Sequence, residues 1–255
     1  MKIYFNANNK ATLEALQQCG VKNVMLSHRY SYANITKFRP KFESIFVVPG
    51  TKDDSDKYHQ FLKDKREYYD LATQYDVYYD MDKTLKYLKK ERDDGIDWTI
   101  PTLQGNYLHH IAQLRAEPNT MVGVGEMKDR EEMREQIRKL PKSVKYHGLA
   151  KAKFIKEGVF DSVNTAMWIG AVLSKKSVVL NNNEPMTMLF GERGRGMIPI
   201  LRHVCEQHKE HMEKCGITID KILDCDYSSL LKTPIALMFM PQLKAYGYYD
   251  ENFNQ

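Results

Sequence analysis

The chain has 255 residues, of which 42% are hydrophobic, and a formal net charge of +5. This apolar content supports a sizeable core and excludes wholesale disorder, and the length fits one large domain or one domain with an appendage. The small positive charge permits a polyanionic partner without requiring one. The four cysteines form no CxxC pair, and no segment is apolar enough for a signal peptide or a membrane span, so we expect a soluble cytoplasmic protein without a membrane partner.

Short β-rich segments alternate with segments of helical periodicity over the first two thirds of the chain. Such alternation is typical of parallel strands joined by right-handed crossovers. We therefore predict an α/β fold, a compact (β/α)8 TIM-like barrel over residues 1–170. A doubly wound open sheet is the competing fold, although no GxGxxG motif follows the first strand. The eight predicted strands are Ile3–Phe5, Val21–Leu26, Ser44–Val48, Asp76–Tyr79, Trp98–Thr102, Met121–Val124, Ser143–His147 and Val159–Val163.

The pattern changes after residue 170. A polar NNNEP turn is followed by the glycine- and arginine-rich stretch GERGRG at 191–196 and by a predicted helix over Ile198–Cys215. We predict a helical C-terminal extension over residues 171–255, packed on the barrel. Arg193 and Arg195 in GERGRG could hold the phosphates of a nucleic-acid backbone, or they could belong to an ordinary solvated loop.

Polar or glycine residues follow five consecutive predicted strands. The catalytic groups of a parallel barrel lie at the carboxyl ends of its strands, so these residues predict a lined pocket. Glycines let a flat ligand approach the backbone, and Gln and Asp side chains can pair with the amide edge of a heterocycle. The residues, strand by strand, are Asp80 and Asp82; Gln104 and Gly105; Gly123, Gly125 and Glu126; His147 and Gly148; and Asp161, Ser162 and Asn164.

Several of these residues have structural alternatives. Asp82 could cap the following helix, and His147 could make structural hydrogen bonds at the barrel mouth. The His- and Cys-rich stretch His203–Cys215 suggests zinc, but it lacks closely spaced cysteines. We therefore predict no metal and no cofactor.

The ordered strand ends resemble those of the tRNA-guanine transglycosylase superfamily, especially its short phage-type 7-deazaguanine DNA transglycosylases. The segments YDVYYDMDK, TLQGN, MVGVGE, YHGLA and FDSVNTAMW stand in the family order, and the resemblance covers roughly residues 1–170. It implies that an Asp on strand eight attacks C1′ of a nucleotide and displaces guanine, which a 7-deazaguanine replaces. The base-binding residues that it implies are Asp82, Gln104, Gly105, Gly123, Gly125 and His147.

The sequence departs from the family pattern in two places. The expected Asp-Ser-Gly is VVPG at 47–50, and Asp53 or Asp54 could substitute for its Asp. Strand eight has two possible registers: one makes Asp161 the nucleophile, and the other puts Asn164 at that position. Residues three apart point to opposite faces of a regular strand, so only one of these two can face the pocket. We favour Asp161.

The resemblance implies an enzyme that exchanges guanine for a 7-deazaguanine in DNA or tRNA. DNA is favoured because the zinc region of the tRNA-type enzymes is absent. Two other functions stay open: an inactive barrel that binds nucleic acid or protein, and an N-glycosidic hydrolase. A homo-oligomer is possible, and a phage-encoded chain would act in the host cytoplasm.

Overall fold

The computed structural model describes residues 1–50, 54–114, 121–151, 154, 157–166, 168–169, 175–182 and 184–241. The chain forms two compact units. The first contains residues 1–6 and 23–165, and the second contains residues 7–22 and 166–255. The segment that follows the first strand therefore belongs to the second unit, although it precedes most of the barrel in the sequence.

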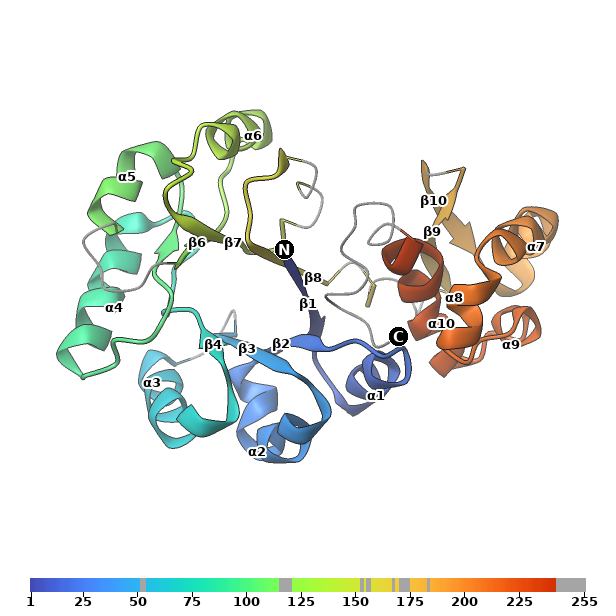
Figure 1. Cartoon of the computed structure of the whole chain (residues 1–255), viewed down its shortest axis with the longest axis horizontal. Helices are drawn as coiled ribbons and strands as arrows, with labels where there is room; N and C mark the ends of the chain where they lie inside the picture. The colour runs from blue at the N-terminus through green and yellow to red at the C-terminus, as the bar shows by residue number, and fades with distance from the viewer. Residues whose placement is uncertain are drawn as a thin grey trace. The chain divides into compact units, whose positions relative to one another are not determined.

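The described part of the first unit is an α/β structure around a curled sheet of eight parallel strands (Figure 1). The sheet order is β4-β3-β2-β1-β8-β7-β6-β5, so the first strand pairs with the last, and the sequence neighbours β4 and β5 form the two edges. This arrangement confirms the predicted barrel-like α/β fold. The strands are β1 (Lys2–Ala7), β2 (Asn23–Ser27), β3 (Ser44–Val48), β4 (Leu71–Ala72), β5 (Thr102–Leu103), β6 (Met121–Val124), β7 (Lys145–Gly148) and β8 (Ser162–Thr165).

Hydrogen bonds join the two edges of the sheet. The Ile100 N–H donates to the Ala72 carbonyl at 2.7 Å, and the Gln74 N–H donates to the Ile100 carbonyl at 3.0 Å. The Gln74 side-chain oxygen then accepts the Thr102 N–H at 3.1 Å. A side-chain amide thus takes the place of a backbone carbonyl, and the sheet is joined edge to edge at β4 and β5.

Helices follow the strands and lie outside the curled sheet (Figure 1). Aspartates cap three of them: Asp54, Asp80 and Asp129 each accept a backbone N–H from the first turn of the following helix. The helices are α2 (His28–Phe38), α3 (Ser55–Asp64), α4 (Met81–Asp93), α5 (Tyr107–Leu114) and α6 (Arg130–Arg138), with 3₁₀ turns at Arg39–Lys41 and Arg66–Tyr68.

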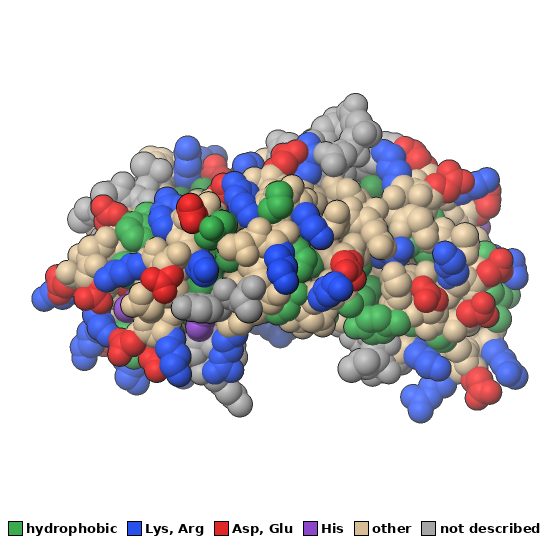
Figure 2. All heavy atoms as spheres, turned by 90° about the horizontal axis from the view of Figure 1, so that it is seen from below, with side chains coloured by type: hydrophobic (Ala, Val, Ile, Leu, Met, Phe, Trp, Pro, Cys, Tyr) green, Lys and Arg blue, Asp and Glu red, His purple; other side chains and the backbone are tan. Residues whose placement is uncertain are grey.

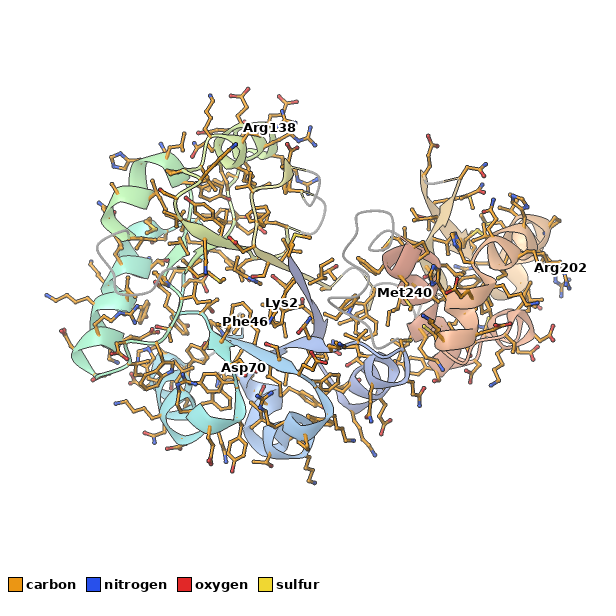
Figure 3. All side chains as sticks on the ribbon, in the orientation of Figure 1. Lys2, Phe46, Asp70, Arg138, Arg202 and Met240 are labelled. Atoms are coloured by element: carbon orange, nitrogen blue, oxygen red, sulfur yellow. The ribbon has the colours of Figure 1, made fainter. Side chains whose placement is uncertain are left out.

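Aromatic side chains fill the middle of the barrel. Tyr4, Met25, Phe46 and Ile100 form a buried cluster, and Phe46 lies inside the curve of the strands (Figure 3). The His147 ring packs edge-on against Phe46, with 4.4 Å between ring centroids. Because these side chains fill the centre, a ligand site must lie at an end of the barrel.

Three predicted strands were misplaced. Strand five was expected at Trp98–Thr102, but β5 is Thr102–Leu103. Strand four was expected at Asp76–Tyr79, but β4 is Leu71–Ala72. The aromatic residues after it turn away because the Thr84 hydroxyl accepts the Val77 N–H and Asp80 begins α4. Strand eight was expected at Val159–Val163, but β8 begins only at Ser162.

The second unit combines an antiparallel hairpin with helices (Figure 1). GERGRG forms a 3₁₀ turn in which a Cβ on Gly194 would overlap the Leu189 carbonyl. The predicted helix Ile198–Cys215 is interrupted at His208. No described helix is long and apolar enough to cross a membrane. The elements are α1 (Lys10–Gln18), β9 (Lys176–Asn181), β10 (Glu184–Leu189), α7 (Ile198–Gln207), α8 (Lys209–Lys214), α9 (Ile219–Leu223), α10 (Tyr227–Pro234) and a π-helical turn at Ile235–Phe239.

A buried carboxylate on α4 fixes the chain that leaves β4. Glu91 is fully buried and accepts the Tyr75 N–H at 2.7 Å and the Thr99 hydroxyl at 2.7 Å. The His59 ring nitrogen lies 3.1 Å from the same carboxylate. Glu91 thus holds the backbone immediately before Asp76.

We predict that Glu91→Ala lowers the free energy of unfolding by about 3–5 kcal/mol, because it leaves buried polar partners unpaired. Chemical denaturation measures this change. The control is Glu14→Ala, which removes an exposed carboxylate paired with Lys10 and should cost about 0.5 kcal/mol or less. Equal losses in the two variants would contradict the structural role of Glu91.

Candidate functional site

Two polar side chains and one backbone N–H meet beyond the ends of β4, β5 and β6. Gln104 is fully buried, and its Nε2 donates to Asp76 Oδ2 at 2.5 Å. Its Oε1 accepts the Glu126 N–H at 3.1 Å. One amide group therefore fixes both the carboxylate after β4 and the backbone after β6, at the carboxyl end of the barrel.

Asp76 has an unusual environment for a carboxylate. Burial raises its pKa from 3.8 to about 6, and the hydrogen bond from Gln104 opposes this shift. The residue is still partly accessible to solvent. A carboxyl group of this kind can hold or release a proton near neutral pH, which suits acid–base chemistry and heterocycle recognition.

A buried lysine lies beside the second carboxylate of the cluster. Lys151 is 1% exposed, and its Nζ lies 3.0 Å from Glu126 Oε1 and 3.0 Å from the Leu149 carbonyl oxygen. The Glu126 side chain itself is 35% exposed. The ion pair stabilises a negative charge that a ligand could still reach.

Asn164 completes the polar rim at β8. Its Oδ1 accepts the Ala150 N–H at 2.7 Å, and its Nδ2 donates to Asn6 Oδ1 at 2.8 Å. It therefore lies at the carboxyl end of β8, between the end of β1 and the chain that leaves β7. A neutral amide cannot serve as the nucleophile that the resemblance implies at this position.

Asp161 lies at the opposite end of the barrel. It precedes β8, is exposed, and accepts the Tyr146 N–H through Oδ2 at 2.8 Å. Its backbone carbonyl accepts the Lys2 N–H at the start of β1. It lines a cavity of about 650 Å³ at the amino ends of β7 and β8. The structure therefore separates Asp161 from the cluster at the carboxyl ends.

The glycines at the strand ends make room for protein atoms. A Cβ on Gly125 would overlap the Gln104 side chain, and one on Gly123 would lie 3.0 Å from the Thr102 hydroxyl. Gly105 has φ of +70°, which favours glycine, and its N–H donates to the Glu126 carbonyl. Gly105 and Gly125 position Gln104 and the turn after it, and Gly123 leaves space for the Thr102 hydroxyl.

The other two predicted base-binding residues, Asp82 and His147, do not join this cluster. Asp82 lies exposed in the first turn of α4, and the strand-end residue Asp80 caps that helix by accepting the Lys83 N–H. His147 is fully buried below the mouth, with Nδ1 2.8 Å from the Ser162 hydroxyl. Burial lowers the His147 pKa to about 3, so the ring is neutral at physiological pH.

A recess of about 280 Å³ adjoins Asp76. It is lined by Pro49 and Gly50 at the end of VVPG and by residues 75–78. Of the two aspartates that could substitute near VVPG, Asp54 caps α3, and Asp53 lies outside the described residues. Asp76 is therefore the carboxylate that lines this recess.

Arg193 and Arg195 are exposed in the second unit, and Arg195 lies 3.8 Å from Glu192. On the face in Figure 2, positive and negative side chains are interspersed. Within the described residues, no three His, Cys, Asp or Glu side chains are grouped to hold a metal ion.

No model of a known protein family matches this chain, and no curated protein matches it significantly.

Sequence analysis did not propose Asp76 as a site residue. The segment LATQYD carries the missed signal, because its Asp lies four residues beyond Ala72, the last residue of the short strand β4. Val77, Tyr78 and Tyr79 favour strand structure, so we extended the predicted strand through them. Its predicted end then lay next to Asp80 and Asp82, beyond Asp76.

We predict that the Asp76 carboxyl titrates near pH 6. Its pKa is higher in the folded chain than in the unfolded chain, so the folded state binds the proton more tightly between about pH 4 and 6. This group therefore stabilises the fold less as the pH rises through that window, and Asp76→Asn should abolish that part of the pH dependence. The carboxyl ¹³C chemical shift measures the midpoint, and a midpoint near 3.8 would contradict this environment.

Proposed function

We propose that this chain is a transglycosylase-like enzyme that exchanges guanine for a 7-deazaguanine in nucleic acid, with DNA favoured over tRNA. The observation that carries the proposal is the Asp76–Gln104 pair beside a recess at the carboxyl end of a parallel barrel. Enzymes of this architecture place their chemistry at that end.

Asp76 suits the edge of a guanine-type base. Its carboxylate can accept hydrogen bonds from a ring N–H and an exocyclic amino group that point in the same direction. Gln104 holds the carboxylate in place, and Gly125 gives Gln104 the space that it occupies. The resemblance assigned this role to Asp82, and we now assign it to Asp76.

Glu126 is the carboxylate that we propose as the nucleophile. Lys151 stabilises the negative charge of Glu126, and the Glu126 side chain is accessible at the mouth of the barrel. In the first step a Glu126 oxygen bonds to C1′, the bond from C1′ to N9 breaks, and the departing guanine, held by the Asp76 carboxylate, takes a proton from water. In the second step the incoming 7-deazaguanine gives its N9 proton to water, bonds to C1′ and releases Glu126.

A second candidate is a binding module without catalysis. In one of the two registers of strand eight, Asn164 stands where the resemblance expects the nucleophile, and VVPG lacks the family's Asp. In that case the barrel would bind a guanine-type base or nucleic acid and leave the glycosidic bond intact.

Base exchange distinguishes the two candidates. Duplex DNA and, separately, tRNA with isotope-labelled guanine are incubated with the whole chain and a 7-deazaguanine base. We expect label release from DNA, a loss of rate of at least about a thousand-fold in Glu126→Gln, and about a hundred-fold or more in Asp76→Asn.

The matched control is Asp161→Asn, which changes a carboxylate at the other end of the barrel and should retain the full rate. Loss of exchange in Asp161→Asn alone would contradict the assignment of Glu126. Base binding without release of label in the unmodified chain would favour the binding module.

A further inference from the structure

Two neighbouring tyrosines stand out on the loop between β4 and α4. Tyr78 is 56% exposed and Tyr79 is 50% exposed, although large aromatic side chains are usually more buried. Their ring centroids lie 6.4 Å apart, with 55° between the ring planes. The pair presents two aromatic surfaces to solvent within three residues of Asp76.

The backbone holds this pair in an uncommon conformation. Tyr79 has φ of 63°, which is rare for a bulky residue and costs about 1–3 kcal/mol. Below the loop, Tyr75 packs against Tyr87 at 4.7 Å between centroids, and Glu91 accepts the Tyr75 N–H. Thr84 accepts the Val77 N–H at 3.0 Å. The loop is therefore anchored on α4, and the tyrosines project from a fixed base.

Tyr78 also belongs to the recess. It lines the same cavity as Asp76, Pro49 and Gly50. Burial of part of its ring raises the Tyr78 pKa, and the nearby charges of Asp76 and Glu126 add to the shift. The Tyr78 side chain thus lines the recess together with Asp76 and remains exposed to solvent.

We propose that Tyr78 and Tyr79 form a stacking platform for unpaired nucleobases, and that this platform makes single-stranded or locally opened nucleic acid the preferred ligand. Base-on-aromatic stacking tolerates any base, because every base has a flat π face. A base in a duplex is already stacked and cannot lie on these rings, so the platform would favour an extruded nucleotide over a paired one. This inference deepens the proposed function, since it specifies the form of nucleic acid that reaches Asp76.

Cationic side chains are available beside the platform. Lys83 and Lys86 are exposed on the first two turns of α4, directly after the tyrosines. Lys83 pairs with Asp80 at 3.0 Å. Such lysines can contact a phosphate backbone whose bases stack on the neighbouring rings.

The test measures binding of a fluorescent single-stranded DNA of about twenty nucleotides, and of the same sequence as a duplex, to the whole chain. We expect Tyr78→Ala and Tyr79→Gly each to weaken single-strand binding by about five- to a hundred-fold, and to affect duplex binding much less. Glycine is chosen for Tyr79 because it accepts the positive φ without strain. Tyr78→Phe, which keeps the ring and removes the hydroxyl, should bind like the unmodified chain.

The matched control is Tyr227→Ala, because Tyr227 is 46% exposed on α10 in the second unit. Its substitution should leave single-strand binding unchanged. The platform is refuted if the Tyr78 and Tyr79 variants bind like the control, if the unmodified chain binds duplex as tightly, or if it binds neither DNA.

Binding of the free 7-deazaguanine base, measured by calorimetry with Asp76→Asn, separates this inference from the proposed function. If Asp76→Asn leaves free-base binding unchanged while the tyrosine variants lose single-strand binding, the base site is wrong and the platform stands. If Asp76→Asn abolishes free-base binding and the tyrosine variants behave normally, the platform is wrong and the base site stands.

Discussion

The closure of the sheet between β4 and β5 is the constraint on which the candidate site depends. These strands are far apart in the sheet order and meet only because Ile100 pairs with Ala72 and Gln74. Gln74 and Thr102 are hydrogen-bonded to each other in this closure. Asp76 lies two residues beyond Gln74, and Gln104 lies two residues beyond Thr102. An open sheet would leave the two side chains on opposite edges. The barrel therefore creates the hydrogen bond between Asp76 and Gln104.

Burial of polar groups at one end of the barrel gives that end its chemical character. Tyr4, Phe46 and the neutral ring of His147 fill the centre of the barrel. The centre therefore has no space for a charged side chain together with the water that would solvate it. Gln104 and Lys151 are buried just above this layer, and each is hydrogen-bonded to a carboxylate. A protein that needed only a stable barrel could fill these positions with apolar side chains at no cost in stability. Retention of two carboxylates with dedicated buried partners is instead typical of a binding or catalytic site.

The two ends of the barrel also explain why Asp161 and Asn164 have different surroundings. Asp161 stays at the amino end, where it accepts a backbone N–H from β7 and helps to align the first residues of the strands. Asn164 lies at the mouth and connects Asn6 with Ala150. Because a neutral amide cannot attack C1′, the proposed mechanism uses Glu126, an accessible carboxylate beside a buried cation.

The sequence predicted the barrel well and the site only in part. Strands β3 and β6 were placed at their true bounds because their apolar runs are short and end in glycine or a turn. Gln104 was found because it follows an apolar run directly. Asp76 was missed because Val77, Tyr78 and Tyr79 favour strand structure locally, and the contacts from Thr84 and Glu91 that bend the chain come from the later helix α4. Asp161 was favoured because strand eight starts three residues later than its apolar run suggests.

The most direct test of the account is a crystal structure of the whole chain soaked with a 7-deazaguanine base. We predict that the base lies in the recess between Gly50 and Tyr78, with its ring N–H and amino group within hydrogen-bonding distance of the Asp76 carboxylate. A base bound instead at the amino end beside Asp161, or a mouth that stays empty at a base concentration well above millimolar, would contradict the account.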